Sequence, residues 1–310
     1  MHLRTRTAAM TLALPLGLGL LAGCADDEPE PVSSETGSDP APSPSDEPTT
    51  EPTPTPEPTE TAPTSEPDPS TVAVPVYFTG ETPMGLRLYR EFRQVEADNP
   101  LEEAAALLLA GDALDPDYGT LLTAVTIESI EAGDGEIVVT LGEDSPLSAD
   151  KGTSRQEARL AVQSLVYTLQ GVAQTRDPVR LQLADGRPAD LYGQPTGRGV
   201  KAAPQLDVLS LVSLTTPGEG DTASGTLAVE GVAASFEATV PYAVLDASGA
   251  EVVTGFSTAE QFGDRLYPFA AEVDISALEP GTYTFVARTD DPSDGEGPGP
   301  FEDTRTFVVE

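Results

Sequence analysis

Residues 154–171 read SRQEARLAVQSLVYTLQG, and they give the clearest structural signal in the chain. Ser154 and Glu157 form a capping box, in which each side chain satisfies a free backbone N–H at the start of a helix. Apolar residues then recur at the spacing of one helix face: Ala158, Ala161, Val162, Leu165, Val166 and Leu169. This segment therefore predicts an amphipathic helix with that face in a core.

Strand patterns lie on both sides of this predicted helix. Residues 71–78 and 84–95 alternate in polarity, which is typical of half-buried strands. Residues 126–130 and 137–141 are predicted to pair as a hairpin across a Gly-Asp-Gly turn, and residues 179–183 form a further strand. The long helix is thus expected to pack among strands.

A second helix is predicted to start at Asn99 and Pro100. Asn is a common helix cap, and Pro suits the first helical position. Glu102 and Glu103 follow at the positive end of the helix dipole, and Gly111 is expected to end the helix. The residues that share its apolar face are Leu101, Ala104, Ala105 and Leu108.

The pattern changes part-way along the chain. Helices and strands interleave over residues 71–200, which predicts a compact α+β domain. Beyond residue 205 the helical period disappears, and about seven short strands are separated by regular turns. The clearest alternation is that of Phe236, Ala238, Val240, Tyr242 and Val244. Residues 205–310 therefore predict an all-β sandwich.

The N-terminus has the pattern of an exported lipoprotein. Residues 1–23 combine a basic start with a short apolar run, too short to span a bilayer comfortably. The motif LAGC, which ends at Cys24, resembles the lipobox of bacterial lipoproteins. The resemblance implies cleavage before Cys24, acylation of that residue, and anchoring to the extracytoplasmic face of the cell membrane.

Residues 24–70 predict a disordered linker. They consist mostly of Pro, Thr, Ser, Glu and Asp, without Lys or Arg. Such a segment buries too little apolar surface to offset the entropy of ordering. It is expected to act as a spacer, and its Thr/Ser-Pro repeats also permit O-glycosylation.

The composition excludes several function classes. The formal net charge of −36 repels nucleic acids. Cys24 is the only cysteine, and His2, within the predicted signal peptide, is the only histidine. The mature chain therefore has no disulfide, histidine-based triad, cysteine nucleophile or usual zinc site. We expect no catalytic residues, metal or cofactor.

Three motifs that suggest chemistry have simpler explanations. Ser148 and Lys151 fit the S-x-x-K pattern of penicillin-binding enzymes, but the partner motifs are missing and the capped helix begins later. Glu102 and Glu103 are adjacent on a helix, so they point about 100° apart and suit helix electrostatics better than paired catalysis. The acidic loop 290–296 departs from EF-hand spacing, which leaves either a looser calcium site or a turn with solvated acids.

Arg87, Arg90 and Arg93 stand out in an acidic chain. Strand alternation places Arg87 and Arg93 on one face and Arg90 on the other. Two interpretations stay open: contact of Arg87 and Arg93 with a partner, or pairing with acids of the same chain. Exposed strand edges offer a second route to assembly, by β-augmentation with a neighbouring copy.

Two resemblances to known domains cover nearly all the chain beyond the linker. Residues 71–196 resemble the GerM domain of sporulation and spore germination proteins. The matching features are Tyr77-Phe78, Arg90-Glu91, PLEEA at 100–104, Leu107-Leu108, Gly111, and Glu157 with LVYTL at 165–169. Residues 206–310 resemble the immunoglobulin-like domain of spore germination proteins, on GVA at 231–233, SFEA at 235–238, Pro268-Phe269, PGTY at 280–283, and Asp294-Gly295 before Pro298. These resemblances imply an envelope lipoprotein without catalytic residues, and a GerM-type domain similar to ring-building modules of secretion systems.

The sequence therefore predicts a membrane-anchored envelope lipoprotein that acts as a non-enzymatic scaffold or accessory protein. It would bind an envelope protein or self-assemble through its GerM-like domain. The alternative is a ligand-binding lipoprotein that captures a cell-wall fragment or small solute between its domains. A wall hydrolase that uses carboxylates alone is a third hypothesis.

Overall fold

The computed structural model describes residues 70–291 and 295–310, which belong to one compact unit, Thr64–Glu310. The predicted signal peptide, Cys24 and all of the predicted linker except Ser70 lie outside the described residues. Among the helices in the described part, none is long and apolar enough to cross a membrane. The described chain has an α+β N-terminal half (residues 71–200) and a β-sandwich C-terminal half (residues 205–310), which confirms the predicted fold class.

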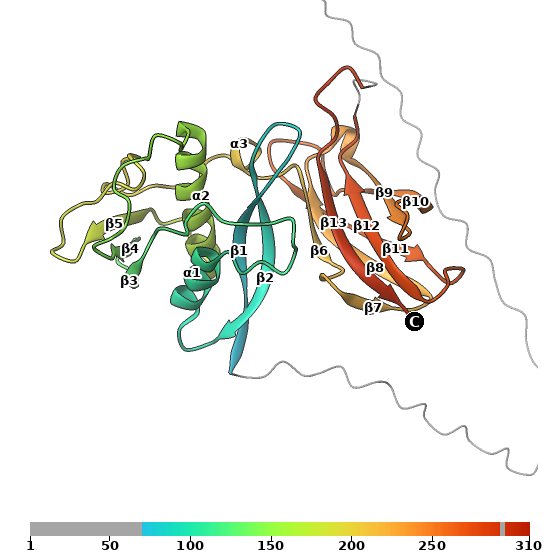
Figure 1. Ribbon diagram of the computed structural model, residues 1–310, viewed down its shortest axis with the longest axis horizontal. Coiled ribbons are helices and arrows are strands. Elements are labelled where there is room, and N and C mark those ends of the chain that lie inside the picture. Colours follow the sequence, from blue (N-terminus) through green and yellow to red (C-terminus); the bar gives the residue numbers. More distant parts are fainter. Residues whose placement is uncertain (1–69, 292–294) are drawn as a thin grey trace, which may run out of the picture. The chain divides into compact units, whose positions relative to one another are not determined.

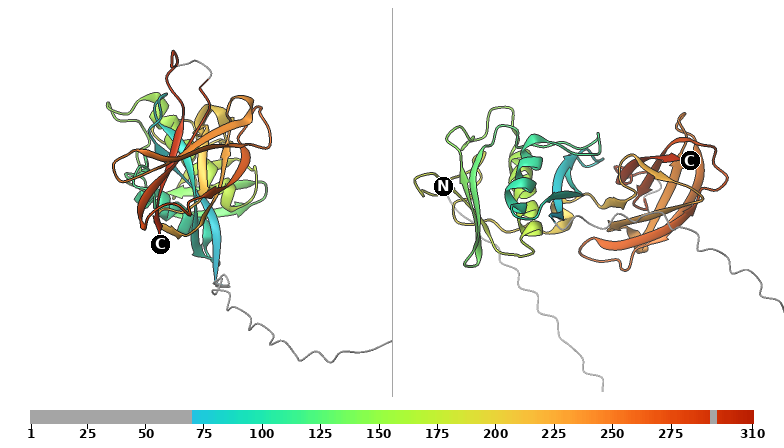
Figure 2. Two further views of the ribbon diagram at one scale, coloured as in Figure 1. Left: turned by 90° about the vertical axis from the view of Figure 1, so that its right-hand side faces the viewer. Right: turned by 90° about the horizontal axis from the view of Figure 1, so that it is seen from below.

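The N-terminal half has three layers. Its elements are β1 (Thr71–Gly80), β2 (Arg87–Glu96), α1 (Pro100–Ala110), β3 (Ile127–Gly133), β4 (Glu136–Leu141), α2 (Arg155–Val172) and β5 (Val179–Leu183). β1 and β2 form an antiparallel pair, while β3, β4 and β5 form a second sheet in that order, with β4 and β5 parallel. Both helices lie between the two sheets (Figure 1). A view from below shows the same layering (Figure 2).

The three-layer arrangement makes α2 the central element. The capping box of Ser154 and Glu157 is present, and the predicted apolar face is buried. The opposite face is buried as well, because sheets cover the helix on both sides. Its polar side chains are therefore hydrogen-bonded: Thr168 Oγ1 accepts from Tyr77 N at 3.0 Å, and Gln163 Oε1 accepts from Ala203 N at 2.7 Å.

The ends of α1 and β2 differ in detail from the prediction. Pro100 occupies the first turn of α1, and Gly111 ends the helix in the left-handed region at φ 68°. Asn99 holds the cap position, but its side chain makes no capping hydrogen bond, so that prediction was wrong. β2 begins at Arg87 and not at residue 84, because a turn closed by hydrogen bonds between Thr82 and Gly85 precedes it.

The C-terminal half is a sandwich of two sheets. Its elements are α3 (Gln205–Val208), β6 (Val212–Thr216), β7 (Asp221–Ala223), β8 (Thr226–Ala233), the 3-10 turn η1 (Phe236–Ala238), β9 (Thr239–Leu245), β10 (Glu251–Thr258), β11 (Tyr267–Asp274), β12 (Gly281–Arg288) and β13 (Glu302–Val309). One sheet has the order β10-β9-β12-β13-β7 and the other β11-β8-β6. The eight strands described here compare with about seven predicted.

Two residues that the sequence analysis assigned to a strand of the sandwich lie outside it. Phe236 and Ala238 do not extend β9, because they lie in η1. Glu237 and Ala238 have φ values of 50° and 60°, in the left-handed region that a strand cannot contain. The turn leaves the Phe236 ring 44% exposed, while β9 keeps Val240 and Val244 in the core.

We expect Ser154→Ala to destabilise the chain by about 1 kcal/mol, because Glu157 N loses the hydroxyl that accepts its hydrogen bond. Urea unfolding followed by circular dichroism measures the loss. Ser148→Ala, in the exposed loop before the helix, is the control and should change stability by less than about 0.5 kcal/mol. Equal effects of the two changes would show that the capping box contributes nothing.

Candidate functional site

The two halves meet through a cluster of apolar side chains. Leu88 of β2 and Leu160 and Tyr167 of α2 pack with Val208, Leu209 and Leu266 of the C-terminal half. The connecting backbone is also held in place, because Ser210 N donates to Leu88 O at 2.8 Å. We call this contact region the junction.

The centre of the junction's polar side is Arg305, on β13. Its guanidinium is buried and contacts the carboxylates of Asp115 and Asp303, the latter at 3.0 Å. Arg305 Nη1 also donates to Tyr118 OH at 3.1 Å, and that hydroxyl donates to Asp303 Oδ1 at 2.6 Å. Asp115 and Tyr118 come from the N-terminal half, so these four residues, here called the junction network, tie the halves together.

Glu91 on β2 positions the loop that supplies Asp115. Its carboxylate accepts from Leu114 N at 3.0 Å and from Asp115 N at 2.9 Å. Asp115 in turn accepts from Asp117 N at 2.8 Å, which fixes its side chain toward Arg305. Glu91 therefore holds the loop so that Asp115 lies in contact with Arg305.

The junction network holds two carboxylates against one guanidinium in a buried place. Burial raises the pKa of Asp115 to about 7, with backbone hydrogen bonding and Arg305 opposing the rise. Burial also raises the pKa of Asp303 and that of Tyr118. Burial by itself would lower the pKa of Arg305, but Asp303, Tyr118 and Asp115 together raise it. Asp115 therefore keeps its proton to a higher pH than an exposed aspartate does.

A raised carboxyl pKa can indicate an acid catalyst, but the surroundings here indicate a structural role. Asp303 already accepts from Leu214 N at 2.6 Å and from Thr304 N at 2.9 Å, in addition to Tyr118 and Arg305. A substrate would have to displace these internal donors. The carboxylates of the junction network are therefore fully used in joining the halves.

The arginines singled out in the sequence lie apart and are held by the chain itself. Arg93 contacts Asp112 and lies 3.7 Å from Glu91, which is the internal pairing that was one of the two interpretations. Arg87 Nη1 donates to Leu206 O at 3.0 Å. Arg87 begins β2 and Arg93 is six residues further along the strand, about 20 Å away at the rise of a strand. Their contact with a partner stays a prediction.

The other sequence motifs are placed as follows. Ser148 and Lys151 lie exposed in a loop before α2. Glu102 and Glu103 are in the first turn of α1. Part of the acidic loop 290–296 lies outside the described residues. Within the part of the chain that is described, no group of three His, Cys, Asp or Glu side chains could hold a metal.

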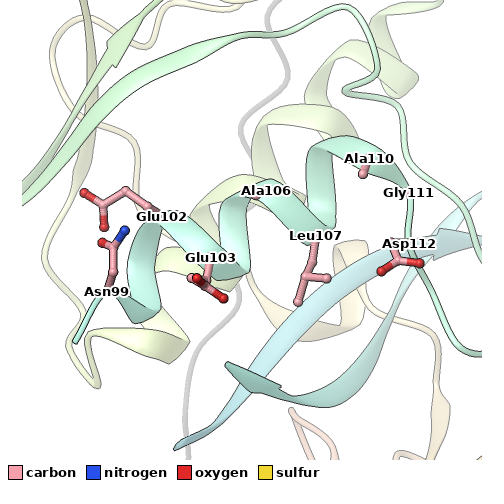
Figure 3. A pocket seen from close by; sticks show the side chains of 8 residues that line it. All are labelled: Asn99, Glu102, Glu103, Ala106, Leu107, Ala110, Gly111 and Asp112. Carbon is pink, nitrogen blue, oxygen red and sulfur yellow. The ribbon is translucent and has the colours of Figure 1, made fainter. Parts of the chain in front are cut away.

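A broad shallow concavity runs along the outer side of α1 (Figure 3). It has a volume of about 720 Å³, and its centre is apolar, with Ala106, Leu107 and Ala110. Glu102 and Glu103 lie toward one end and Asp112 at the other, so the rim is acidic. We call this surface the α1 concavity. Sequence analysis assigned Glu102 and Glu103 to helix electrostatics and did not identify it.

Two family models match the chain in the order that the sequence resemblances predicted. Residues 75–190 match the family described as "Sporulation and spore germination". Residues 211–296 match the family described as "Immunoglobulin-like domain of bacterial spore germination". Two regions of the chain are therefore similar to domains described for spore germination. Neither of these two families is enzymatic.

Solved structures resemble this chain only distantly. The tandem GerMN domains of the sporulation protein GerM from Bacillus subtilis are 16% identical, with 67% of this chain and 63% of that chain covered and a TM-score of 0.35. This chain thus spans less than two thirds of that structure's length. CopC from Methylosinus trichosporium OB3b is 20% identical over 31% of this chain and 91% of its own, with a TM-score of 0.22. No curated protein matches the chain.

We expect Arg305→Met to destabilise the chain by about 3–5 kcal/mol, because it leaves two buried carboxylates without their counter-charge. Urea unfolding gives the difference in free energy. Arg187→Met is the control, since Arg187 forms an exposed pair with Asp185 and its loss should cost less than about 1 kcal/mol. If both variants lost under about 1 kcal/mol, the junction network would not hold the halves together.

The raised pKa of Asp115 predicts that the stability of the folded chain depends on pH, and that Asp115→Asn removes this dependence. The pKa is 3.8 without perturbation and about 7 in the folded chain, so the folded state binds the proton between these values. This contribution to stability is present below the lower pKa and is lost as pH rises through the higher one. The melting temperature of Asp115→Asn minus that of the wild type should therefore increase from about pH 5 to about pH 8. A difference that stays constant or falls would contradict the raised pKa.

Proposed function

We propose that this protein is a non-enzymatic accessory protein of the bacterial envelope, anchored to the outer face of the cell membrane, that presents two joined domains to a protein partner. The observation that carries the proposal is the junction. Non-enzymatic domains are joined there by a buried network whose carboxylates are already engaged. Such a unit is suited to hold surfaces in a defined arrangement and offers no free catalytic group at that place.

The lipobox-like motif at Cys24 supports the anchor. A cysteine with two or three acyl chains stays in the membrane. The composition of residues 24–70 suits the spacer that we propose between the anchor and the described unit. The proposed location is therefore the extracytoplasmic face of the membrane.

The α1 concavity is the surface that we propose for the partner. Its apolar centre and acidic rim suit a segment that combines apolar and basic side chains. A second copy of this chain would bring the same acids against Glu102, Glu103 and Asp112. With a formal net charge of −36, such self-association is disfavoured, so we propose a different protein as the partner.

Capture of a wall fragment or small solute between the halves is the second candidate. Residues of both halves line a hollow of about 90 Å³ beside Ser210, one of about 350 Å³ beside Tyr118 and one of about 570 Å³ beside Phe92. Sites for sugars, peptides and drug-sized molecules occupy roughly 300–1,000 Å³. The smallest hollow is too small for a muropeptide, whereas the two larger ones fall in this range.

A photo-crosslinking residue at Leu107 tests the proposed function in intact cells. We expect a discrete adduct with one other envelope protein, weakened by Glu103→Arg because that change reverses a charge on the rim. The same residue at the exposed Leu147 is the control and should not give this adduct. Cys24→Ala should release the chain from the membrane fraction and reduce the adduct.

Three outcomes would contradict the proposal. Equal patterns from positions 107 and 147 would mean that the α1 concavity binds no specific partner. An adduct with a second copy of this chain would replace the separate partner by self-assembly. Retention of Cys24→Ala in the membrane fraction would argue against the lipid anchor.

A further inference from the structure

The hollow of about 570 Å³ between the halves is lined by charges of both signs. Phe92 of β2 forms part of its wall, and 44% of this residue is exposed. We call this surface the Phe92 hollow. Its charged lining residues are Arg90 of the N-terminal half and Glu230 and Glu260 of the C-terminal half. A ligand placed here therefore meets one cation and two anions.

The floor of the Phe92 hollow is the outer face of the sheet β11-β8-β6. Val232 pairs with Pro268, and Glu230 with Ala270, so these four side chains lie on the same face of β8 and β11. The alternate residues of both strands are buried in the sandwich core. The floor is thus apolar at Val232, Pro268 and Ala270, and the acids stand beside it.

Arg90 is held at the β6 side of the hollow by neutral groups. Its Nη2 donates to Thr215 Oγ1 at 3.2 Å, and its guanidinium carbon lies 4.7 Å from the Phe92 ring centroid. It also hydrogen-bonds the Tyr77 side chain. Within the described residues it forms no ion pair with the acids of the hollow. The guanidinium is therefore oriented, and its remaining N–H groups can bind a carboxylate.

The two acids lie at different distances from this guanidinium. Glu230 is on β8, opposite the irregular step of β6 around Thr215, and so lies near Arg90. Glu260 lies beyond β11, because its backbone N donates to Pro268 O at 2.9 Å. Since β6 and β11 are two strand spacings apart, the guanidinium and Glu260 are separated by on the order of 10 Å. Both acids are exposed and can receive a cation.

This order of charges matches the ends of a short peptide. An extended chain spans about 3.3–3.6 Å per residue, so the termini of a tripeptide lie on the order of 10 Å apart. Its carboxylate can then meet Arg90 while its amino group meets Glu260, with the middle residue over Pro268. A basic side chain on the last residue would meet Glu230, beside the carboxylate end.

We infer that the Phe92 hollow binds a short peptide with a free carboxyl end and a basic last residue. Arg90 binds its carboxylate, and Glu230 and Glu260 bind its cationic groups. The inference rests on the second candidate function, capture between the halves, and names the ligand class for it. The α1 concavity takes no part, because Leu107 and its neighbours do not line this hollow.

Isothermal titration calorimetry of the full mature chain with the tripeptide Ala-Ala-Lys tests the site. We expect binding that weakens about tenfold or more when the carboxyl end is amidated or the amino end is acetylated, because each change removes a charged hydrogen bond. The amide is decisive. It carries more positive charge than the free acid, so general attraction to an acidic chain would strengthen its binding, whereas the site requires it to be weaker.

Two variants assign the ends of the peptide. Arg90→Gln should bind the acid and the amide equally, and Glu260→Gln should bind the free and the acetylated amino end equally while still preferring the acid. Arg265→Gln is the control for the first, since Arg265 also lies over an aromatic ring, Tyr267, but outside the hollow. Glu272→Gln is the control for the second, because Glu272 is exposed on β11 outside the hollow. Both controls should behave as the wild type.

Three results would overturn the inference. They are no binding at millimolar peptide, an amide that binds as well as the acid, and preferences that survive both Arg90→Gln and Glu260→Gln. Because Glu260 is exposed, its variant stays informative even if Arg90→Gln fails to fold. Failure of this test leaves the cross-linked adduct at Leu107 unaffected, so it is distinguishable from failure of the proposed partner surface.

Discussion

The buried guanidinium of Arg305 constrains the whole described chain. A charge removed from water must be matched by opposite charge and by hydrogen-bond acceptors. Asp303 is two residues away on the same strand, but Asp115 comes from the loop after α1, 190 residues earlier in the chain. Glu91 on β2 holds that loop, so the position of one arginine depends on the β1–β2 pair and on α1. The junction network therefore links the two halves through buried contacts.

The junction gives a structural role to titratable groups in a chain for which the sequence predicts no catalytic residues. In the described part of the chain, Asp115 and Asp303, whose carboxyl pKa values are raised, are used in the junction, and the α1 concavity is an open helix face with an acidic rim. A rigid pair of non-enzymatic domains can hold a partner at a defined distance and angle, whereas loosely tethered domains cannot. The proposed lipid anchor at Cys24 would give this body its place in the envelope.

The sequence predicted what local physics determines. The capping box, the helix stop at Gly111, the hairpin and the alternating strands all follow from neighbouring residues, and they are present. The junction network was not predictable, because Asp115 lies among other loop acids and nothing near it indicates an arginine on the last strand. The prediction that Phe236 and Ala238 belong to a strand was wrong for a related reason, because alternating polarity does not reveal a turn in the left-handed region. The α1 concavity was missed because Glu102 and Glu103 already had a sufficient local explanation.

Differential scanning calorimetry of the mature chain tests the central claim that the junction makes one body of two domains. The account predicts a single transition whose calorimetric and van't Hoff enthalpies agree, as for a two-state unit. In Arg305→Met the transition should separate into two, one for each half. Two separate transitions in the wild type would contradict the claim, because the halves would then unfold independently.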